Sequence, residues 1–386
     1  MLSFLFWLGF IFILHSYVLY PFLLKYLLRK KGSASNRSML THRPPLSIII
    51  PAHNEEQVLR DKLNSILASD YDLASLEILI GIDASHDFSG IIAASFADKF
   101  PHFKVKHFEE RQGKIKIVNA LVPEAKHELI ILTDANVLFT KNTLKALSQH
   151  FIDPTIGLVD TRMQNYGLKN TGISMPESNY IAGEVKIKEA EGTLWGAMMG
   201  PFGGCFAFRK MCFTPIPNHF LVDDFYINMT CLEQGFKCIN EQNAVVLEDV
   251  SNDLGVEFKR KIRISAGNFQ NLSRFWRLLL KFNGLSFAFL SHKVLRWVSP
   301  VLIIFMILQI IAQADHSVFY SICYFILIMI PLTFVVDYFA RRQQTHVVFL
   351  RYIIHFVSMN VALFLGLLQF LKGIRSSVWE PTKRHQ

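Results

Sequence analysis

Residues 45–56 of the chain, PLSIIIPAHNEE, contain the stretch that decides its fold. The apolar run that ends at Ile50 predicts a short buried strand, and Pro51 follows it directly. Similar runs recur further along the chain, with helically spaced apolar residues such as those at 58–67 between them. Strands that alternate with helices predict an α/β domain with a mostly parallel sheet and right-handed crossovers. The further strands are expected at 77–82, 103–108 and 128–132.

The overall composition predicts a membrane protein that carries one water-exposed domain. Of the 386 residues, 51% are hydrophobic and only 18% are charged, whereas soluble proteins have about 25% charged residues. Residues 1–24 contain no Asp, Glu, Lys or Arg, and about 20 apolar residues suffice to cross a bilayer. Three further apolar runs lie within 297–371. Because the charged residues concentrate between these regions, we expect the water-exposed domain there.

Basic residues set the expected orientation of the membrane segments. The basic cluster at 25–37 follows the first apolar run, which argues against a cleaved signal peptide and for a retained helix. Since basic flanks favour the cytoplasmic side, a multi-pass protein of a bacterial-type inner membrane with a cytoplasmic domain is expected. Four crossings would place the basic tail outside, against this rule. Either one run is interfacial, or residues 275–294 form more than an amphipathic surface helix.

The expected organisation therefore has five parts. They are a transmembrane helix at 1–28, a soluble domain at 45–267, interfacial helices at 268–296, transmembrane helices at 297–371 and a basic tail at 372–386.

Net charge and cysteine content exclude several classes of protein. The formal net charge is +9, but no motif of a known nucleic-acid reader is present, so basic membrane flanks explain the excess better. The five cysteines are odd in number and include no C-x-x-C pair, which argues against a disulfide framework and a zinc site. We therefore expect no nucleic-acid partner, and reduced thiols in the cytosol.

Polar residues follow several of the predicted strands, at the edge where parallel sheets bind ligands. In the first loop Asn54 is interpreted as the cap of the next helix, with Gln57 completing a capping box. The loop at 83–87 offers two carboxylates and is also compatible with a simple turn. After the fourth strand, Asp134 and Asn136 provide the oxygen ligands that Mg²⁺ or Mn²⁺ prefers. A metal there would neutralise a diphosphate leaving group.

Two charged groups lie outside these loops. Asp223 and Asp224 precede a segment with helical spacing, where they fit a helix cap or a catalytic role equally well. The basic cluster at 259–263 suits phosphate binding or contact with anionic lipid headgroups. It contains Lys259, Arg260, Lys261 and Arg263.

The order of these segments along the chain is more specific than any one of them. The segments are SIIIPAHNEE, IDASHD, RQGKxxxxNAL, LTDAN, GGCFAFR, VDDF and EFKRKIR. In this order they resemble the membrane-anchored family 2 glycosyltransferases, a group that includes cellulose, hyaluronan and poly-N-acetylglucosamine synthases. The resemblance covers roughly Pro45 to Pro300. It implies a GT-A, Rossmann-like fold and transfer from a nucleotide-activated sugar, usually a UDP-sugar, with inversion at the anomeric carbon.

The resemblance also implies a role for each matching residue. The implied cofactor is Mg²⁺ or Mn²⁺, and the implied partners are a nucleotide-sugar donor, a glycan or lipid-linked acceptor, and membrane lipids. The residues are Pro51, Ala52, Glu55, Asp83, Lys114, Asp134, Ala135 and Arg263 for the nucleotide sugar, Asp134 and Asn136 for the metal, Gly203, Gly204 and Asp223 on the acceptor side, and Asp224 as general base.

The chain departs from the family pattern at several positions. Asn136 replaces the second Asp of the D-x-D metal motif, which should weaken metal binding without abolishing it. The acidic pair is Asp-Asp in place of the more usual Glu-Asp, and Ile264 replaces the Trp of Q-x-x-R-W that contacts the acceptor in processive synthases. Segment 379–384 is similar to a cytoplasmic W-x-T-x-R element of hyaluronan-type synthases, which favours a cytoplasmic C-terminus.

These departures leave three interpretations of the product and the role. The first is a synthase that builds a polysaccharide, which the apolar helices after the domain favour. The second is an enzyme that adds a single sugar to a lipid-phosphate carrier, which the missing Trp favours. The third is a noncatalytic membrane partner that keeps the fold.

Overall fold

A mixed sheet forms the centre of the water-exposed domain. The computed structural model describes residues 2–31, 43–166, 174–249, 254–343, 347–374 and 376–378. Within these residues the sheet has eight strands in the order β3-β2-β1-β4-β7-β6-β8-β5. The strands are β1 (Leu46–Ala52), β2 (Leu76–Asp83), β3 (Phe103–Phe108), β4 (Leu129–Thr133), β5 (Leu138–Phe139), β6 (Ile156–Tyr166), β7 (Cys205–Arg209) and β8 (Lys237–Asp249).

The first half of the sheet matches the prediction from sequence. β1 pairs in parallel with β2 and with β4, and β2 pairs in parallel with β3. The helices that connect them cross over the faces of the sheet, as expected for a Rossmann-like half. They are α3 (Glu56–Leu67), α4 (Ser89–Ala97) and α5 (Lys114–Glu124). The α/β fold class is therefore confirmed.

The second half of the sheet differs from a parallel arrangement. β7 runs antiparallel to both β4 and β6, although β6 and β8 are parallel to each other. The sequence pattern does not distinguish these cases, because a strand buried on both faces is apolar in either direction. The remaining helices of the domain are α6 (Thr143–Ser148), α7 (Ser174–Trp195), α8 (Asp223–Glu233) and α9 (Leu254–Phe275).

The two faces of the sheet bury two apolar cores. Alternate residues of β1 separate onto them, with Ile49 in one core and Ile48 and Ile50 in the other. Each of these side chains is fully buried, and burying one such side chain contributes about 1.5–3 kcal/mol. The carboxyl ends of β1, β2 and β4 are thereby held at one edge of the sheet, where the loops carry the polar residues.

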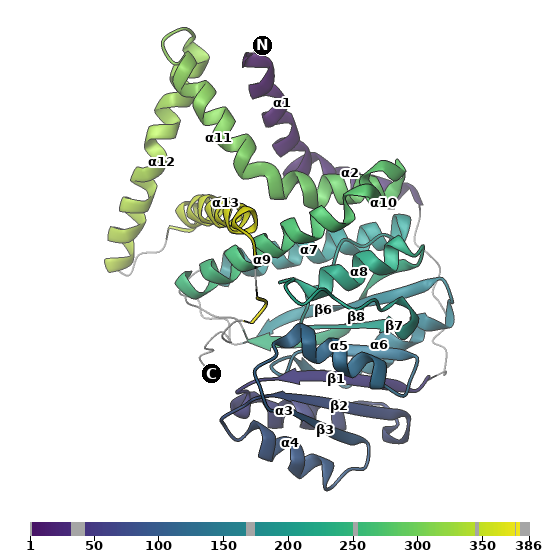
Figure 1. The fold of residues 1–386 in the computed structure, drawn as a ribbon. Helices are drawn as coiled ribbons and strands as arrows, with labels where there is room; N and C mark the ends of the chain where they lie inside the picture. The colour runs from purple at the N-terminus through teal and green to yellow at the C-terminus, as the bar shows by residue number, and fades with distance from the viewer. Residues whose placement is uncertain are drawn as a thin grey trace.

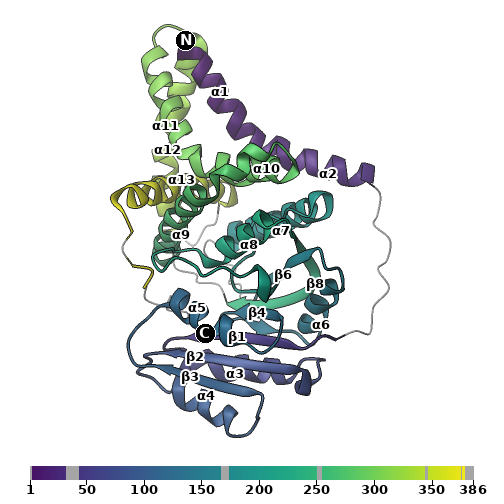
Figure 2. The same cartoon turned by 45° about the vertical axis from the view of Figure 1, so that its right-hand side comes forward.

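A set of long apolar helices stands on this domain (Figures 1 and 2). Among the described residues, four helical segments are long and apolar enough to cross a membrane, at Ser3–Lys31, Gly284–Gln313, Val318–Ala340 and Phe349–Lys372. The expectation of several apolar helices around the domain agrees with this result. The segments contain α1 (Leu2–Leu14), α2 (Tyr20–Lys31), α10 (Gly284–Ala288), α11 (Leu295–Gln313), α12 (Val318–Arg342) and α13 (Val348–Lys372).

The last of these helices, α13, has a different course from the others. Both views show α1 and α11 rising away from the domain, whereas α13 runs across their direction at the level of α9 (Figures 1 and 2). α9 and α13 approach closely, because a Cβ added at Gly366 would lie 2.4 Å from Ser265 Cβ. Ser265 Oγ also donates a hydrogen bond to the carbonyl oxygen of Leu363, at 2.9 Å.

Helices run through two of the domain boundaries that were expected from the sequence. α9 continues from Leu254 to Phe275, through the expected boundary at 267. A helical segment then runs from Gly284 through a π-helical turn (Phe289–Val294) into α11. The W-x-T-x-R-like element at 379–384 lies outside the described residues.

Candidate active site

The polar loops of the sheet open into a cavity of about 780 Å³ that lies between the sheet and the long helices. α9, the start of α11 and α13 form its other wall. Every site residue that the family resemblance implies lines this one cavity, although their chain positions span more than two hundred residues. The set is Pro51, Ala52, Glu55, Asp83, Lys114, Asp134, Ala135, Asn136, Gly203, Gly204, Asp223, Asp224 and Arg263.

The first two loops support each other, and the expected capping box is wrong. Asn54 has a positive φ of 54°, and its Oδ1 accepts a hydrogen bond from the backbone of His86 at 3.0 Å. α3 instead begins after Glu55, and the backbone N–H of Glu56 donates to Asp87 Oδ2 at 3.0 Å. A side chain from the second loop thus caps the helix that follows the first, which a search for local capping pairs does not find.

Asp83 holds the loop that leads into α5. Its carboxylate accepts the backbone N–H groups of Gln112, at 2.6 Å, and Gly113, at 2.8 Å, and forms an ion pair with Arg111. Carboxylates that accept several N–H donors are strongly fixed in position. Asp83 therefore orients Lys114, the first residue of α5, toward the cavity. Arg111 lies in the RQGK segment but was not among the expected site residues.

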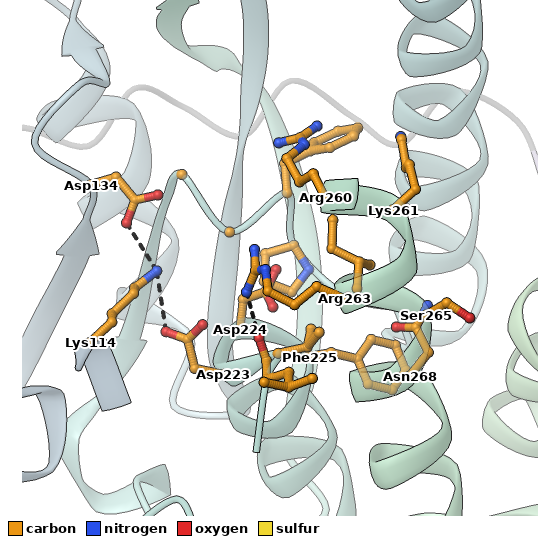
Figure 3. Close-up of a pocket in the computed structure, with 18 of the residues that line it drawn as sticks. Lys114, Asp134, Asp223, Asp224, Phe225, Arg260, Lys261, Arg263, Ser265 and Asn268 are labelled. Atoms are coloured by element: carbon orange, nitrogen blue, oxygen red, sulfur yellow. Dashed lines mark hydrogen bonds and ion pairs between the residues drawn. The ribbon is translucent and has the colours of Figure 1, made fainter. Parts of the chain in front are cut away.

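Lys114 bridges two acidic groups that line the cavity, at Asp134 and at Asp223 (Figure 3). Its Nζ lies 2.9 Å from Asp134 Oδ1 and 3.2 Å from Asp223 Oδ2. Burial alone would lower the pKa of Lys114, but the carboxylates of Asp134 and Asp223 outweigh it and raise the pKa above its ordinary value. The ammonium group is therefore permanently charged and places the Asp134 loop next to the start of α8.

Asp224 lies in the first turn of α8 and faces the cavity. Burial and the neighbouring charge of Asp223 raise the pKa of Asp224 to about 7, against the partial opposition of Lys114. A carboxylate with a pKa near neutrality is a stronger base than an exposed one and is still about half ionised at pH 7. The acidic pair is thus both a helix start and a chemically distinctive site, as the two interpretations from sequence allow.

Gly203 makes room for this carboxylate. It has a φ of 84°, and a Cβ added there would lie 2.7 Å from Asp224 Oδ2. Only glycine adopts this backbone conformation without strain and leaves space for the carboxylate. We predict that Gly203→Ala displaces the Asp224 carboxylate and lowers turnover at least about tenfold, since small misplacements of a reacting group are costly.

Gly235→Ala is the matched control for this prediction. Gly235 also has a positive φ, of 90°, but a Cβ there would meet nothing within 4 Å. Both variants carry backbone strain, and only Gly203→Ala crowds the cavity. Turnover and melting temperature should be measured for both. Equal turnover in the two variants would show that Gly203 has no role beyond its backbone conformation.

Asp134 and Asn136 share their corner of the cavity with a further carboxylate. Asn136 Nδ2 donates to Glu248 Oε1 at 3.1 Å, and all three side chains line the cavity. This donor set of oxygen atoms fits a hard divalent cation, since Glu248 brings the second negative charge that Asn136 lacks. Glu248 was not expected from the sequence, because it comes from the end of β8, far along the chain.

A buried lysine holds the loop that carries Asp134 and Asn136. Lys62 on α3 is fully buried, and its Nζ donates to Thr133 Oγ1 at 2.8 Å and to the carbonyl oxygen of Val137. Burial lowers the pKa of Lys62 to about 7. Thr133 and Val137 flank the Asp134 to Asn136 segment, so Lys62 fixes both of its ends. A lysine on the apolar face of a predicted helix was the available signal for this residue.

The opposite wall of the cavity is basic (Figure 3). Arg260, Lys261 and Arg263 on α9 line the cavity across from Asp134 and Lys114. Glu257 pairs with Arg260 at 2.9 Å and with Lys261 at 3.3 Å. Lys259, the fourth residue of the expected cluster, is exposed and does not line the cavity. Three of the four cations are therefore placed where an anionic ligand would meet them.

A parallel half-sheet with an acidic cavity at its carboxyl edge is the arrangement of a GT-A glycosyltransferase. Residues 47–214 match the family model described as glycosyl transferase family 2. This part of the chain is therefore a family 2 glycosyltransferase domain, as its motifs indicated.

A solved structure supports the same fold over nearly the whole chain. It is the mannosyltransferase PcManGT from Pyrobaculum calidifontis in complex with GDP-Man and Mn²⁺, with a TM-score of 0.71 and 19% sequence identity. The match covers 95% of this chain and 99% of that one. At this identity the likeness establishes the GT-A fold and not the substrate.

Two curated relatives differ in how much of the chain they match. The poly-beta-1,6-N-acetyl-D-glucosamine synthase of Staphylococcus epidermidis is 22% identical over 366 residues, which is 91% of this chain and 84% of the relative. The "Probable glycosyltransferase YdaM" of Bacillus subtilis is 29% identical over 127 residues, or 32% of this chain and 29% of that protein. The similarity to the second is therefore limited to a part of each chain.

Proposed function

We propose that this glycosyltransferase transfers a sugar, with inversion, from a nucleotide sugar to an acceptor at the membrane surface, and that the reaction depends on Mg²⁺ or Mn²⁺. One observation carries the proposal: Lys114 brings Asp134 and the Asp223–Asp224 pair together in a single cavity. An inverting displacement needs a base on the acceptor side and charge neutralisation on the leaving-group side. The cavity provides candidates for both within one space.

The residues have separate tasks in this reaction. Asp224 accepts the proton of the acceptor hydroxyl while the hydroxyl oxygen attacks the anomeric carbon. The bond from that carbon to the diphosphate breaks on the opposite face, and the nucleoside diphosphate departs. Arg263 and its neighbours on α9 offer positive charge to the departing diphosphate. Asp134, Asn136 and Glu248 would hold the divalent cation, which supplies further charge neutralisation when bound.

The donor side of the cavity is assigned to the first loops. Pro51, Ala52 and Glu55 lie along the end of β1, and Asp83 ends β2 beside them. We assign these residues to the nucleotide, with Ala135 next to the sugar diphosphate. The family resemblance favours a UDP-sugar. The structural neighbour was solved with GDP-Man, so the guanine nucleotide is the alternative that an assay must include.

The course of α13 supports a membrane arrangement with three crossings. We propose that α13 lies in the membrane interface, where it packs on α9, and that α1, α11 and α12 cross the bilayer. Val378, which follows α13, comes within contact distance of Gly113 at the donor loop. The end of the chain then lies on the same side as the catalytic domain. This arrangement keeps the basic residues that end α12 and α13, Arg342 and Lys372, in the cytoplasm.

A panel of nucleotide sugars tests the proposed function. Membranes that contain the protein should release UDP or GDP from at least one donor, and release should require Mn²⁺ or Mg²⁺ and stop on chelation. Nucleotide release is measured with a coupled assay, with membranes lacking the protein as the control. Donor binding without release across the whole panel would favour the noncatalytic interpretation, for which the neutral Asn136 is the motivating observation.

A further inference from the structure

The wall of the cavity separates into an acidic and a basic side. On the domain side the acidic lining residues are Glu55, Asp83, Asp134, Asp223, Asp224 and Glu248, against Arg111 and Lys114. On the side of α7, α9 and α11 the basic lining residues are Lys188, Arg260, Lys261, Arg263, Lys293 and Arg296, against Glu184 and Glu257. Lys188 on α7 pairs with the buried Asp160 at 3.2 Å, and the α9 cations are assigned to the donor diphosphate. Lys293, just before α11, and Arg296, in its first turn, are then the lining cations without an assigned ligand.

These remaining cations gather on one buried carboxylate. Glu184 on α7 forms ion pairs with Arg296 and, at 3.4 Å, with Lys293 Nζ. The side chains are only 6%, 11% and 16% exposed for Glu184, Arg296 and Lys293, respectively. Glu184 therefore faces two cationic side chains in a poorly hydrated place, while the second buried carboxylate of the cluster, Glu191, pairs with His292. The ammonium and guanidinium groups line the cavity, where charged N–H donors suit an anion.

His292 fixes the geometry of this cluster. It is fully buried, and its two ring nitrogens lie 2.9 Å from Glu184 Oε2 and 2.8 Å from Glu191 Oε1. Tyr20 of α2 donates to the same Glu191 oxygen at 2.8 Å. The N-terminal helix, α7 and the start of α11 are thereby locked together around the cations. A cluster with this many fixed contacts is a built part of the cavity and not a loose surface patch.

The cavity continues past the cluster between apolar and aromatic side chains. Tyr17, Trp297, Tyr352, Phe356 and Met359 line this end. They come from helices that are apolar enough to lie in a membrane. Tyr352 and Phe356 on α13 are each 43% exposed, so this end of the cavity opens at the face of the apolar helices. Aromatic side chains of this kind suit the boundary between hydrocarbon and headgroups.

No path for a polymer through the membrane continues from the cavity in the described part of the chain. Among the described residues, none of α12 lines the cavity, and α11 contributes only Arg296 and Trp297 from its first turn. A channel for a sugar polymer needs polar groups along its whole length, because hydrocarbon does not satisfy them. The described helices offer a lateral entrance instead.

We propose that the acceptor is a membrane lipid with a phosphate-bearing headgroup, whose phosphate lies at Arg296 and Lys293 while its hydroxyl-bearing sugar reaches Asp224. The lipid chain leaves the cavity along Tyr352 and Phe356, at the exposed face of α13. The acceptor hydroxyl loses its proton to Asp224 as the new glycosidic bond forms, and the nucleoside diphosphate takes the electrons of the broken bond. This assignment of the acceptor rests on the proposed function, but binding of the lipid does not require turnover.

Lipid binding to the purified protein tests the proposal directly. The probe is a radiolabelled C55 isoprenyl phosphate, and the C55 isoprenol with the same chain and no phosphate is the matched ligand. The phosphate should bind saturably and at least about tenfold more tightly than the alcohol, since a contact between charged groups contributes a factor of this size. Inorganic phosphate should compete weakly, because it lacks the chain that fills the apolar end.

Variants of the cluster separate its role from general stability. Arg296→Gln should weaken binding of the isoprenyl phosphate about tenfold and leave binding of the alcohol unchanged, whereas Arg296→Lys, which keeps the charge but loses the planar fork, should weaken it less. Lys293→Gln, which keeps the pair between Arg296 and Glu184, should show a smaller loss in the same direction. Lys281→Gln is the control, since Lys281 is exposed near the same helices and does not line the cavity.

The outcomes distinguish this inference from the proposed function. Equal affinity for phosphate and alcohol, or unchanged binding in both Arg296→Gln and Lys293→Gln, would overturn the lipid-phosphate site even if nucleotide release is active. Selective binding that these variants weaken would support the site even if no donor in the panel is turned over. If Arg296→Gln does not fold, the affinity of Lys293→Gln for the isoprenyl phosphate and the alcohol decides whether the lipid-phosphate site exists.

Discussion

Replacing Asp224 with asparagine is expected to lower sugar transfer about a thousandfold, because removal of a positioned general base typically costs a factor of 10² to 10⁴. Asn has almost the same shape as Asp, so the contact with Gly203 and the start of α8 should be preserved. Nucleotide release in membranes measures the effect. Donor affinity should change little, since the proposal assigns Asp224 to the acceptor and Lys114 forms its ion pairs with Asp134 and Asp223.

The pH dependence gives an independent test of the same residue. Because Asp224 must be ionised to act as base and its pKa is raised to about 7 by burial and by Asp223, wild-type turnover at low acceptor concentration should rise with pH through this value. Below it the carboxylic acid holds a proton and cannot accept another. The residual activity of Asp224→Asn should lack this rise.

Stability should change in the opposite sense to activity. A carboxyl whose folded pKa is raised lowers stability as the pH rises from its ordinary pKa of 3.8 to about 7, because the unfolded chain ionises there before the folded one, and the cost is complete above about pH 7. Asp224→Asn removes the charge beside Asp223 and should melt at or above the wild-type temperature at pH 8. The difference should shrink toward pH 5. A lower melting temperature at pH 8 would indicate that the variant is damaged rather than catalytically impaired.

Two further variants control the assignment. Asp98→Asn, at an exposed carboxyl after α4, should leave turnover unchanged. Asp223→Asn removes the other member of the pair and loosens Lys114, so it should lower turnover, while the rise with pH persists and moves to lower pH because the charge of Asp223 no longer raises the pKa of Asp224. If Asp223→Asn abolishes turnover and Asp224→Asn leaves it near the wild-type rate, Asp223 is the base and the roles assigned to the pair are reversed.

The local parts of the fold were predictable from the sequence because their signals are local. The apolar run that became β1 and the polar loop after it lie within twelve residues, and the same holds for β2 and β4. The direction of β7 was not predictable, because its pairing partners lie far away in the chain and its apolar residues fit either direction. The capping pair in the first loop failed for a related reason: the side chain that caps α3 comes from the second loop.

The residues of the candidate site likewise separate into those with a local sequence signal and those without one. Residues that lie in recognisable motifs, such as Asp134 and Asp224, were expected to share one site, and they line one cavity. Glu248 and Lys62 were not expected, because the fold of the sheet and of α3 brings them to Asn136 and Thr133. The cluster of Glu184 and Arg296 joins positions 112 apart in sequence, and neither belongs to a motif. Contacts between distant segments bring these residues together, and residue patterns in the sequence do not reveal such contacts.

Removal of the Asp134 carboxylate is expected to cost at least about a hundredfold in kcat/KM, because it takes away both a metal ligand and one partner of Lys114. Asp134→Ala should also raise the Kd for Mn²⁺ in the presence of nucleoside diphosphate. Binding is measured by calorimetry, so the result does not depend on turnover. Loss of Asp134 should leave the pH profile of the residual activity unchanged, since Asp224 remains in place.

The most informative comparison is with a variant that is expected to raise the affinity for Mn²⁺. Asn136→Asp restores a second carboxylate beside Glu248, so it should bind Mn²⁺ more tightly than wild type. Without metal the same variant should be less stable, because the Asn136 amide that donates to Glu248 is lost and two carboxylates face each other. Opposite shifts in Mn²⁺ affinity for Asp134→Ala and Asn136→Asp would place the cation at this corner. If neither variant alters Mn²⁺ affinity, the cation binds elsewhere or is not required, and Asp134 then acts only through Lys114.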